Sequence, residues 1–276
     1  MSVFKTRIIL GAAMLLGFCG IVFLDYFFDV DIGLGILGIV TGGVCLFEFY
    51  NIVEKKGFAP FKVSGIVGGV IVFSGLWLSA YEEGLKPIYT CIFSPIIFWL
   101  FCVQALKRGI DDTIKNISVT VFGIIYIYFF LSFIMPIRHM PNGLSLVLFV
   151  LLITKGGDIG AYLFGRKFGR HKLSSFSPNK TIEGAAFGLF SSLAIAVGLN
   201  TLPGMKILPF YIIAPFGLLV GASGICGDLI ESIIKRDMEV KDSSSAIPAF
   251  GGLLDILDSL LISIPAAYYF LVIIGY

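Results

Sequence analysis

Residues 227–261 read GDLIESIIKRDMEVKDSSSAIPAFGGLLDILDSLL and place acidic side chains inside runs that are otherwise apolar enough for membrane helices. The acids are Asp228, Glu231, Asp255 and Asp258. An ionised side chain at membrane depth costs at least about 2.5–3.5 kcal/mol on the insertion scale. Four such residues so close together are therefore expected to share a function. Their spacing and the residues around them indicate which function it is.

Composition predicts an all-α, polytopic integral membrane protein. Hydrophobic residues make up 57% of the 276 residues and charged residues 14%, with a mean hydropathy of +0.97. A soluble domain has roughly 45–50% apolar and about 25% charged residues. The net charge of +2 gives no indication of a nucleic-acid partner.

Charges, prolines and glycines divide the chain into nine candidate spans, each near the length of about 20 residues that a membrane helix needs. The spans are predicted at residues 8–28, 32–52, 63–81, 88–106, 117–136, 144–164, 185–203, 208–232 and 252–274. The first is predicted to be a retained helix and not a cleaved signal peptide, because its apolar run is long and no clear cleavage site follows.

The distribution of lysine and arginine predicts the topology, because these residues are retained in cytoplasmic loops. With nine spans, one set of alternate segments holds most of them, and the opposite set holds only Lys86, Arg138 and Lys206. The N-terminus is therefore predicted to be cytoplasmic, with the protein in the inner (cytoplasmic) membrane. Two polar segments, 165–183 and 233–250, then share the cytoplasmic face, where a water-soluble substrate can reach them.

The position of these polar segments also predicts a functional division of the chain. Residues 1–140 are interpreted as N-terminal membrane helices that serve packing, lipid or oligomer contacts. Residues 141–276 are interpreted as the C-terminal catalytic region.

Several familiar motifs are disfavoured by their context. GLGILG at residues 33–38 matches a dinucleotide-binding pattern by letter, but it lies in a membrane span and not between a strand and a helix. The five cysteines have no CxxC spacing and predict neither a disulfide framework nor a zinc site. His139 and His171 are the only histidines, which argues against a histidine-built metal centre.

Helical spacing predicts that the acids meet. Asp228 and Glu231 are three residues apart, as are Asp255 and Asp258, so each pair lies on one helix face, and a short loop joins the two helices. Three interpretations are open: helix-end carboxylates that pair with nearby lysine and arginine side chains, the ion relay of a transporter, or a Mg²⁺ site. The adjacent basic residues favour the metal site, because a phosphate-rich substrate needs positive groups and a bare cation relay does not.

The segment SPNKTIEG at residues 177–184 points the same way. Hydroxyl groups, a lysine and the start of a helix can together bind phosphate. The same order of Ser/Thr followed by Glu is also an ordinary helix-capping arrangement. In the preceding span, Lys155 and Asp158 are spaced to form an ion pair.

Two separated segments match one known set of motifs. The downstream residues are Ser232, Lys235, Arg236, Lys241, Asp242, Pro248, Gly251, Gly252, Asp255 and Asp258. The upstream residues are Asp158, Gly160, Ala161, Tyr162, Gly165, Gly169, Ser177, Pro178, Lys180, Thr181, Glu183 and Gly184. On these residues the sequence resembles the phosphatidate cytidylyltransferase family, also called CDP-diacylglycerol synthases. It departs from the family pattern at Phe250, where His is usual, and at Ile256, where Arg is usual.

The resemblance implies a nucleotidyltransferase that acts on CTP and phosphatidate in the lipid membrane, releasing pyrophosphate and forming CDP-diacylglycerol for phospholipid biosynthesis. It implies Mg²⁺ as the cofactor, with a second cation and a homodimer as open alternatives. The expected metal ligands are Asp228, Asp255 and Asp258, with Glu231 as a weaker candidate. The expected catalytic cations are Lys180, Arg236 and Lys241. The expected substrate-binding residues are Ser177, Thr181, Lys235, Asp158 and Glu183.

Two alternatives to this function differ in their products. A CTP-dependent lipid kinase or another CDP-lipid synthase would share the nucleotide and a membrane acceptor, but a kinase would leave CDP and not pyrophosphate. An ion-coupled transporter would move solute without CTP and would not need residues 177–184.

Overall fold

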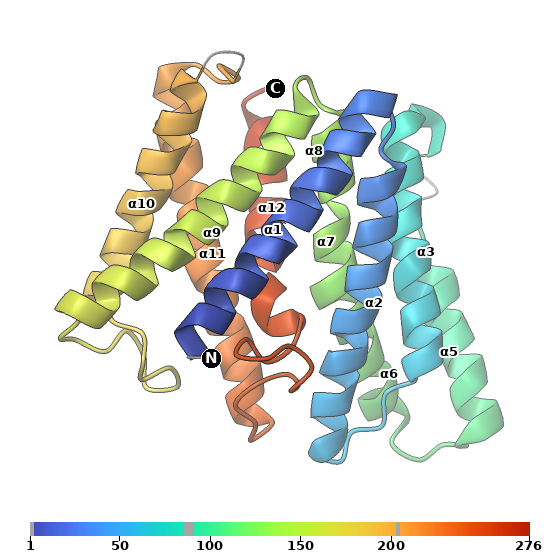
Figure 1. The fold of residues 1–276 in the computed structure, drawn as a ribbon. Coiled ribbons are helices and arrows are strands. Elements are labelled where there is room, and N and C mark those ends of the chain that lie inside the picture. The colour runs from blue at the N-terminus through green and yellow to red at the C-terminus, as the bar shows by residue number, and fades with distance from the viewer. Residues whose placement is uncertain (1–2, 86–90, 203–204) are drawn as a thin grey trace. The chain divides into compact units, whose positions relative to one another are not determined.

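The computed structural model describes residues 3–85, 91–202 and 205–276, and most of these residues are helical (Figure 1). Eight helical stretches in these residues are long and apolar enough to cross a membrane. They are Leu10–Phe28 within α1 (Val3–Phe28), α2 (Ile32–Lys55), α3 (Lys62–Tyr81), Thr113–His139, α9 (Gly143–Phe168), α10 (Ile182–Thr201), α11 (Phe210–Asp237) and α12 (Leu254–Ile273). The protein is therefore a multi-pass membrane protein, as its composition predicts.

The shorter apolar helix α5 (Phe93–Lys107) corresponds to the predicted span at 88–106. Lys86 and the first residues of that predicted span lie outside the described residues. Thr113–His139 is built from α6 (Thr113–Gly123), the π-helical segment η2 (Ile124–Phe129), α7 (Phe130–Ser132) and α8 (Ile134–His139). A single-turn 3-10 helix, η1 (Glu83–Leu85), follows α3. Isolated bridges between single residues are the sole β pairing among the residues placed by the structure.

The chain forms two compact units. The first unit combines residues 1–136 with the returning segment 238–256, and the second combines residues 137–237 with residues 257–276. The assignment of general packing to residues 1–140 and of catalysis to 141–276 stays a prediction.

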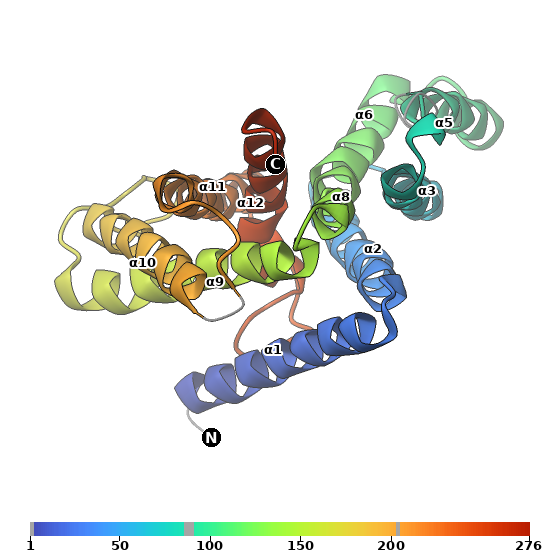
Figure 2. The same ribbon diagram turned by 90° about the horizontal axis from the view of Figure 1, so that it is seen from above.

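Glycines let the helices of the first unit pack closely around aromatic rings. The ring of Tyr128 on η2 occupies the space beside Gly42 of α2 and Gly69 of α3, where a β-carbon would collide with it. The Tyr50 hydroxyl donates to the Thr120 carbonyl oxygen at 2.9 Å and ties α2 to α6. Figure 2 shows α2, α3 and α6 side by side when viewed from above. Small residues that allow backbones to approach are the usual basis of packing between membrane helices.

The second unit is a bundle in which α9 packs against α10 and α11 (Figure 1). Small residues again line the contacts, as at Gly157 and Gly160 of α9, which lie against serine side chains of α10. At Gly227 of α11, an added β-carbon would lie 2.5 Å from the Asp258 carbonyl oxygen and 3.0 Å from the Ser259 α-carbon. This glycine therefore lets α11 lie directly against α12 at the level of Asp228.

Candidate active site

Three carboxylates converge where α11 meets α12. Asp228 and Glu231 lie three residues apart on α11, and Asp258 lies on α12. Each of the three offers an oxygen within 4.8 Å of the others. Glu231 is 1% exposed and Asp258 is 6% exposed, whereas Asp228 is partly accessible. Helical spacing brings Asp228 and Glu231 to one face of α11. The close contact of the two helices at Gly227 brings Asp258 to the same place.

Lysine side chains neutralise two of these acids. Lys180, in the loop before α10, places its Nζ 2.6 Å from Oδ1 of Asp228 and donates to Oγ of Ser232 at 3.3 Å. Lys235, one turn beyond Glu231 on α11, forms an ion pair with it. The cluster therefore combines acidic and basic side chains. Such an arrangement can hold both a divalent cation and the phosphates of a ligand.

A second polar group extends the cluster toward α9. Lys155 donates to Oδ2 of Asp158 at 3.1 Å and to Oγ of Ser259 at 2.7 Å. The Ser259 hydroxyl in turn donates to Oδ2 of Asp158 at 2.9 Å. The predicted ion pair of Lys155 and Asp158 is therefore formed, and it joins α9 to α12 at the residue that follows Asp258. Ser259 was missed by the sequence analysis, because a serine in an apolar helix gives no signal of its own.

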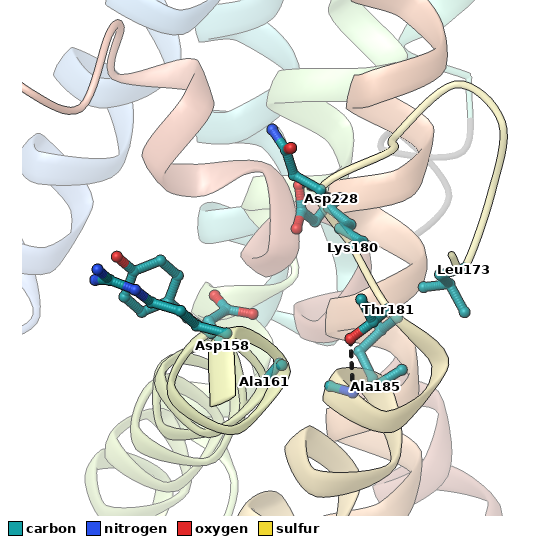
Figure 3. Close-up of a pocket in the computed structure, with 13 residues that line it drawn as sticks. Asp158, Ala161, Leu173, Lys180, Thr181, Ala185 and Asp228 are labelled. Carbon is teal, nitrogen blue, oxygen red and sulfur yellow. Dashed lines mark hydrogen bonds and ion pairs between the residues drawn. The ribbon is translucent and has the colours of Figure 1, made fainter. Parts of the chain in front are cut away.

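A cavity of about 390 Å³ opens beside the cluster. Asp158 on α9 and Asp228 on α11 line it together with Lys180 and Thr181, as Figure 3 shows. The remaining lining residues are Ala161, Tyr162, Gly165, Arg166, Leu173, Asn179, Gly184, Ala185 and Ile225. The cavity thus combines two acids, two basic side chains and an apolar wall, which suits a ligand with a charged and a less polar part.

The segment 177–184 uses several of its polar groups to build its own fold. Thr181 is the N-cap of α10, and its Oγ1 accepts a hydrogen bond from the Gly184 amide at 3.1 Å. Ser177 is buried, and its carbonyl oxygen accepts from the Lys180 amide at 3.1 Å. Glu183 accepts from the amides of Arg170 and His171 and lies 2.5 Å from Nδ1 of His171. These contacts fix the loop that carries Lys180 into the cavity.

The other predicted residues lie in two further places. Arg236 donates from Nε to the Phe176 carbonyl oxygen at 3.2 Å, so it supports the same loop. Lys241 is exposed in the segment between α11 and α12.

Asp255 is not among the three acids that the structure brings together. Its Oδ2 accepts from the Ser243 amide at 2.8 Å, from the Ser243 hydroxyl at 2.7 Å and from the Gly252 amide at 2.7 Å. A carboxylate that accepts several hydrogen bonds near the start of a helix is a capping group. Asp255 therefore holds the turn that begins α12 in this structure, and its role as a metal ligand stays a prediction.

Glu48, like Ser259, was not predicted from the sequence. It lies inside α2, is 5% exposed and accepts hydrogen bonds from the same turn. Its signal was available, since it is an acid within the predicted span 32–52.

The donor set of the cluster is of the kind that Mg²⁺ takes. Magnesium prefers oxygen ligands and is usually held by one or two carboxylates together with waters and substrate phosphates. Asp228, Glu231 and Asp258 offer only oxygen ligands, and these oxygens lie within 4.8 Å of one another. The residues therefore fit the expected cofactor.

The apolar helices and the carboxylate–lysine cluster define a membrane enzyme of the kind that handles phosphate groups. Comparison with known proteins makes the class specific. The model of a family described as the cytidylyltransferase family matches residues 5–274, and the chain belongs to this family. It is accordingly a nucleotidyltransferase.

Curated relatives share most of their length with this chain. A phosphatidate cytidylyltransferase of Synechocystis is 32% identical over 258 residues, covering 82% of this chain and 84% of the relative. A phosphatidate cytidylyltransferase of Thermotoga maritima is 30% identical, covering 96% of this chain and 94% of the relative. One of Bacillus subtilis is 29% identical, with 97% of each chain covered.

Proposed function

We propose that the protein is a phosphatidate cytidylyltransferase. A phosphate oxygen of phosphatidate attacks the α-phosphorus of CTP, the bond from that phosphorus to the oxygen bridging to the β-phosphate breaks, and pyrophosphate leaves. The product is CDP-diacylglycerol. The observation that carries the proposal is the group of Asp228, Glu231 and Asp258 with Lys180 and Lys235 paired to two of its members.

The reaction places demands on charge and position more than on proton transfer. The attacking phosphate monoester is already largely anionic at neutral pH, because its second pKa is about 6. Two anions must be brought together in line, so positive groups that stabilise the developing charge supply most of the rate. Lys180 and Lys235 are proposed to fill this role by turning from their carboxylates toward phosphate oxygens.

We infer that Asp228 and Asp258 hold Mg²⁺, with Glu231 as a further ligand. When bound, the ion supplies neutralisation of phosphate charge and a fixed orientation of the two substrates. Asp158 and Thr181 are proposed to orient the ligand in the cavity, since both line it. Arg236 is proposed to act through the loop that it supports and Lys241 by direct contact with phosphate.

The lysine and arginine bias supports an inner-membrane protein whose site faces the cytoplasm, where CTP is dissolved. Apolar helices around the site would hold the diacyl chains of phosphatidate. A homodimer is part of the same proposal. Cross-linking of the purified protein in lipid tests it, because a monomer gives no cross-linked species of twice the mass.

The test of the activity uses the purified full chain with phosphatidate, MgCl₂ and CTP labelled at the α-phosphate. Labelled CDP-lipid and an equal amount of pyrophosphate are the expected products. Transfer of the γ-phosphate with release of CDP would identify a lipid kinase instead. Solute uptake by proteoliposomes without CTP, and no labelled lipid, would identify a transporter.

Asp258→Asn is the variant that tests the site. It keeps the size of a buried side chain and removes a carboxylate from the cluster, so turnover should fall by a factor of about 10² or more. Asp237→Asn is the matched control, because Asp237 is an exposed residue at the end of α11 and should retain the rate. Near-normal turnover in Asp258→Asn would argue strongly against metal ligation.

A further inference from the structure

A buried acid of α2 holds the turn that leads into α12. Glu48 accepts hydrogen bonds from the Ser244 hydroxyl at 2.7 Å and the Ser243 hydroxyl at 3.2 Å. It also accepts from the amides of Leu253 at 3.1 Å and Leu254 at 2.9 Å. A carboxylate inside a membrane helix is costly unless it is well satisfied. Here both of its oxygens are satisfied by one segment, residues 243–254.

The shape of that segment is adapted to the carboxylate. Gly251 has a φ of +101°, a conformation that residues with a β-carbon rarely adopt. A β-carbon on Gly252 would lie 2.5 Å from Oε2 of Glu48. The Gly-Gly pair of the motif therefore makes the turn possible and lets it approach the acid. Asp255 also accepts from the Ser243 hydroxyl, so both Glu48 and Asp255 hold the turn.

The amides that Glu48 accepts from are at the start of α12, which begins at Leu254. The first amides of a helix have no partner within it, and a carboxylate there both satisfies them and stabilises the helix dipole. Asp258 lies four residues farther along α12. The direction in which a helix leaves its cap sets where a side chain one turn later points. Glu48 therefore contacts the first turn of the helix that carries a proposed metal ligand.

We propose that Glu48 is a positioning residue for cytidylyl transfer. It touches no reacting atom and acts by anchoring residues 243–254 and the first turn of α12, on which Asp255 and Asp258 depend. The proposal rests on the proposed function for its effect on rate. Its effect on the turn does not depend on that function, so the two are measured separately.

Glu48→Gln is the test, because it keeps the size of the side chain and replaces one acceptor oxygen by an amide that cannot accept. The full chain in lipid micelles is assayed with CTP, phosphatidate and varied Mg²⁺. We expect kcat to fall about tenfold, equivalent to about 1.4 kcal/mol, with little change in the KM for CTP. The Mg²⁺ concentration for half-maximal rate should rise. Hydrogen exchange should become faster at the amides of residues 253–258 and stay unchanged elsewhere in the described helices.

Glu54→Gln is the matched control on the same helix. Glu54 forms an ion pair with Lys62 at 2.6 Å, outside the turn. It should retain the wild-type kcat, Mg²⁺ dependence and exchange pattern. Ser244→Ala removes one donor to Glu48 and should shift the same quantities in the same direction by a smaller factor. The rate of the double variant should change less than the product of the two single effects, because Glu48 and Ser244 share a hydrogen bond.

Each outcome decides the question. A Glu48→Gln protein with wild-type kcat and Mg²⁺ dependence overturns the proposal. A rate that falls only in proportion to the folded fraction of the protein also overturns it, because Glu48 would then contribute to folding alone. If Glu48→Gln does not fold, Ser244→Ala serves as the test. An unchanged Mg²⁺ dependence of the Ser244→Ala rate then overturns the proposal. If wild-type protein forms no CDP-lipid, the proposed function fails, and the exchange measurement still tests whether Glu48 holds the turn.

Discussion

Gly227→Ala tests whether the close contact of α11 with α12 assembles the site. The added β-carbon would lie 2.5 Å from the Asp258 carbonyl oxygen and 3.0 Å from the Ser259 α-carbon. Both obstacles are backbone atoms, which cannot rotate aside as a flexible side chain could. Since real β-carbons essentially never show contacts under 3.0 Å, the helices must separate by at least about 0.5 Å.

That separation falls directly on the carboxylate cluster, because Asp228 follows Gly227 and Asp258 supplies the carbonyl. A misplacement of about 1 Å in a catalytic arrangement can cost about 10²-fold in rate. We therefore expect turnover to fall between about tenfold and about a hundredfold. Overpacking should also lower stability by about 1–3 kcal/mol. The measurements are initial rates of CDP-lipid formation and thermal unfolding of the same preparation.

Gly198→Ala is the matched control, because an added β-carbon on this α10 residue meets nothing within 4 Å. It should keep the wild-type rate and gain up to about 1 kcal/mol of stability, since alanine loses less backbone entropy than glycine. The reasoning is refuted if Gly227→Ala keeps a rate within about twofold of wild type while folding normally. It is also refuted if both alanine variants lose activity equally, because the effect would not then depend on the contact with Asp258.

Two further predictions concern the charges of the site. Lys180→Gln should lower kcat/KM for CTP by about 10²-fold, because it removes a cation from the cavity beside Asp228. Lys172 is an exposed lysine of the same loop, and Lys172→Gln should leave kcat/KM unchanged. Equal losses of kcat/KM in both variants would show that the overall charge of the loop matters and not the position of Lys180. Treatment with EDTA should abolish turnover, and added Mg²⁺ should restore it better than Ca²⁺, whose larger radius and looser geometry suit the site less. Full activity of the chelated protein would exclude a divalent cation from the reaction.

Much of the fold was predictable because its signals are local. A membrane helix must satisfy its own backbone hydrogen bonds, so a long apolar run specifies a helix without reference to the rest of the chain. The predicted spans at 32–52, 63–81 and 144–164 accordingly correspond to α2, α3 and α9. The pairing of Asp228 with Glu231 on one face follows from the same local periodicity. The cytoplasmic topology and the identity of the metal stay predictions.

The partners of each acid were harder to predict, because they depend on which helices meet. Asp255 and Asp258 have the same helical spacing as Asp228 and Glu231, yet Asp255 caps the turn and Asp258 joins the cluster. Spacing shows that two side chains share a face but not what that face meets. Thr181 illustrates the same limit, since capping and phosphate binding require the same residue types.

The amino-acid sequence was sufficient to predict a helical membrane protein with acids and lysines in two motif segments, because apolar length and helical period are properties of neighbouring residues. The tertiary structure was needed to show that Asp258 and not Asp255 meets Asp228 and Glu231, and that Glu48 holds the turn before α12. The first depends on a glycine that lets two helices touch. The second joins residues 195 positions apart, and no local pattern specifies a contact at that separation.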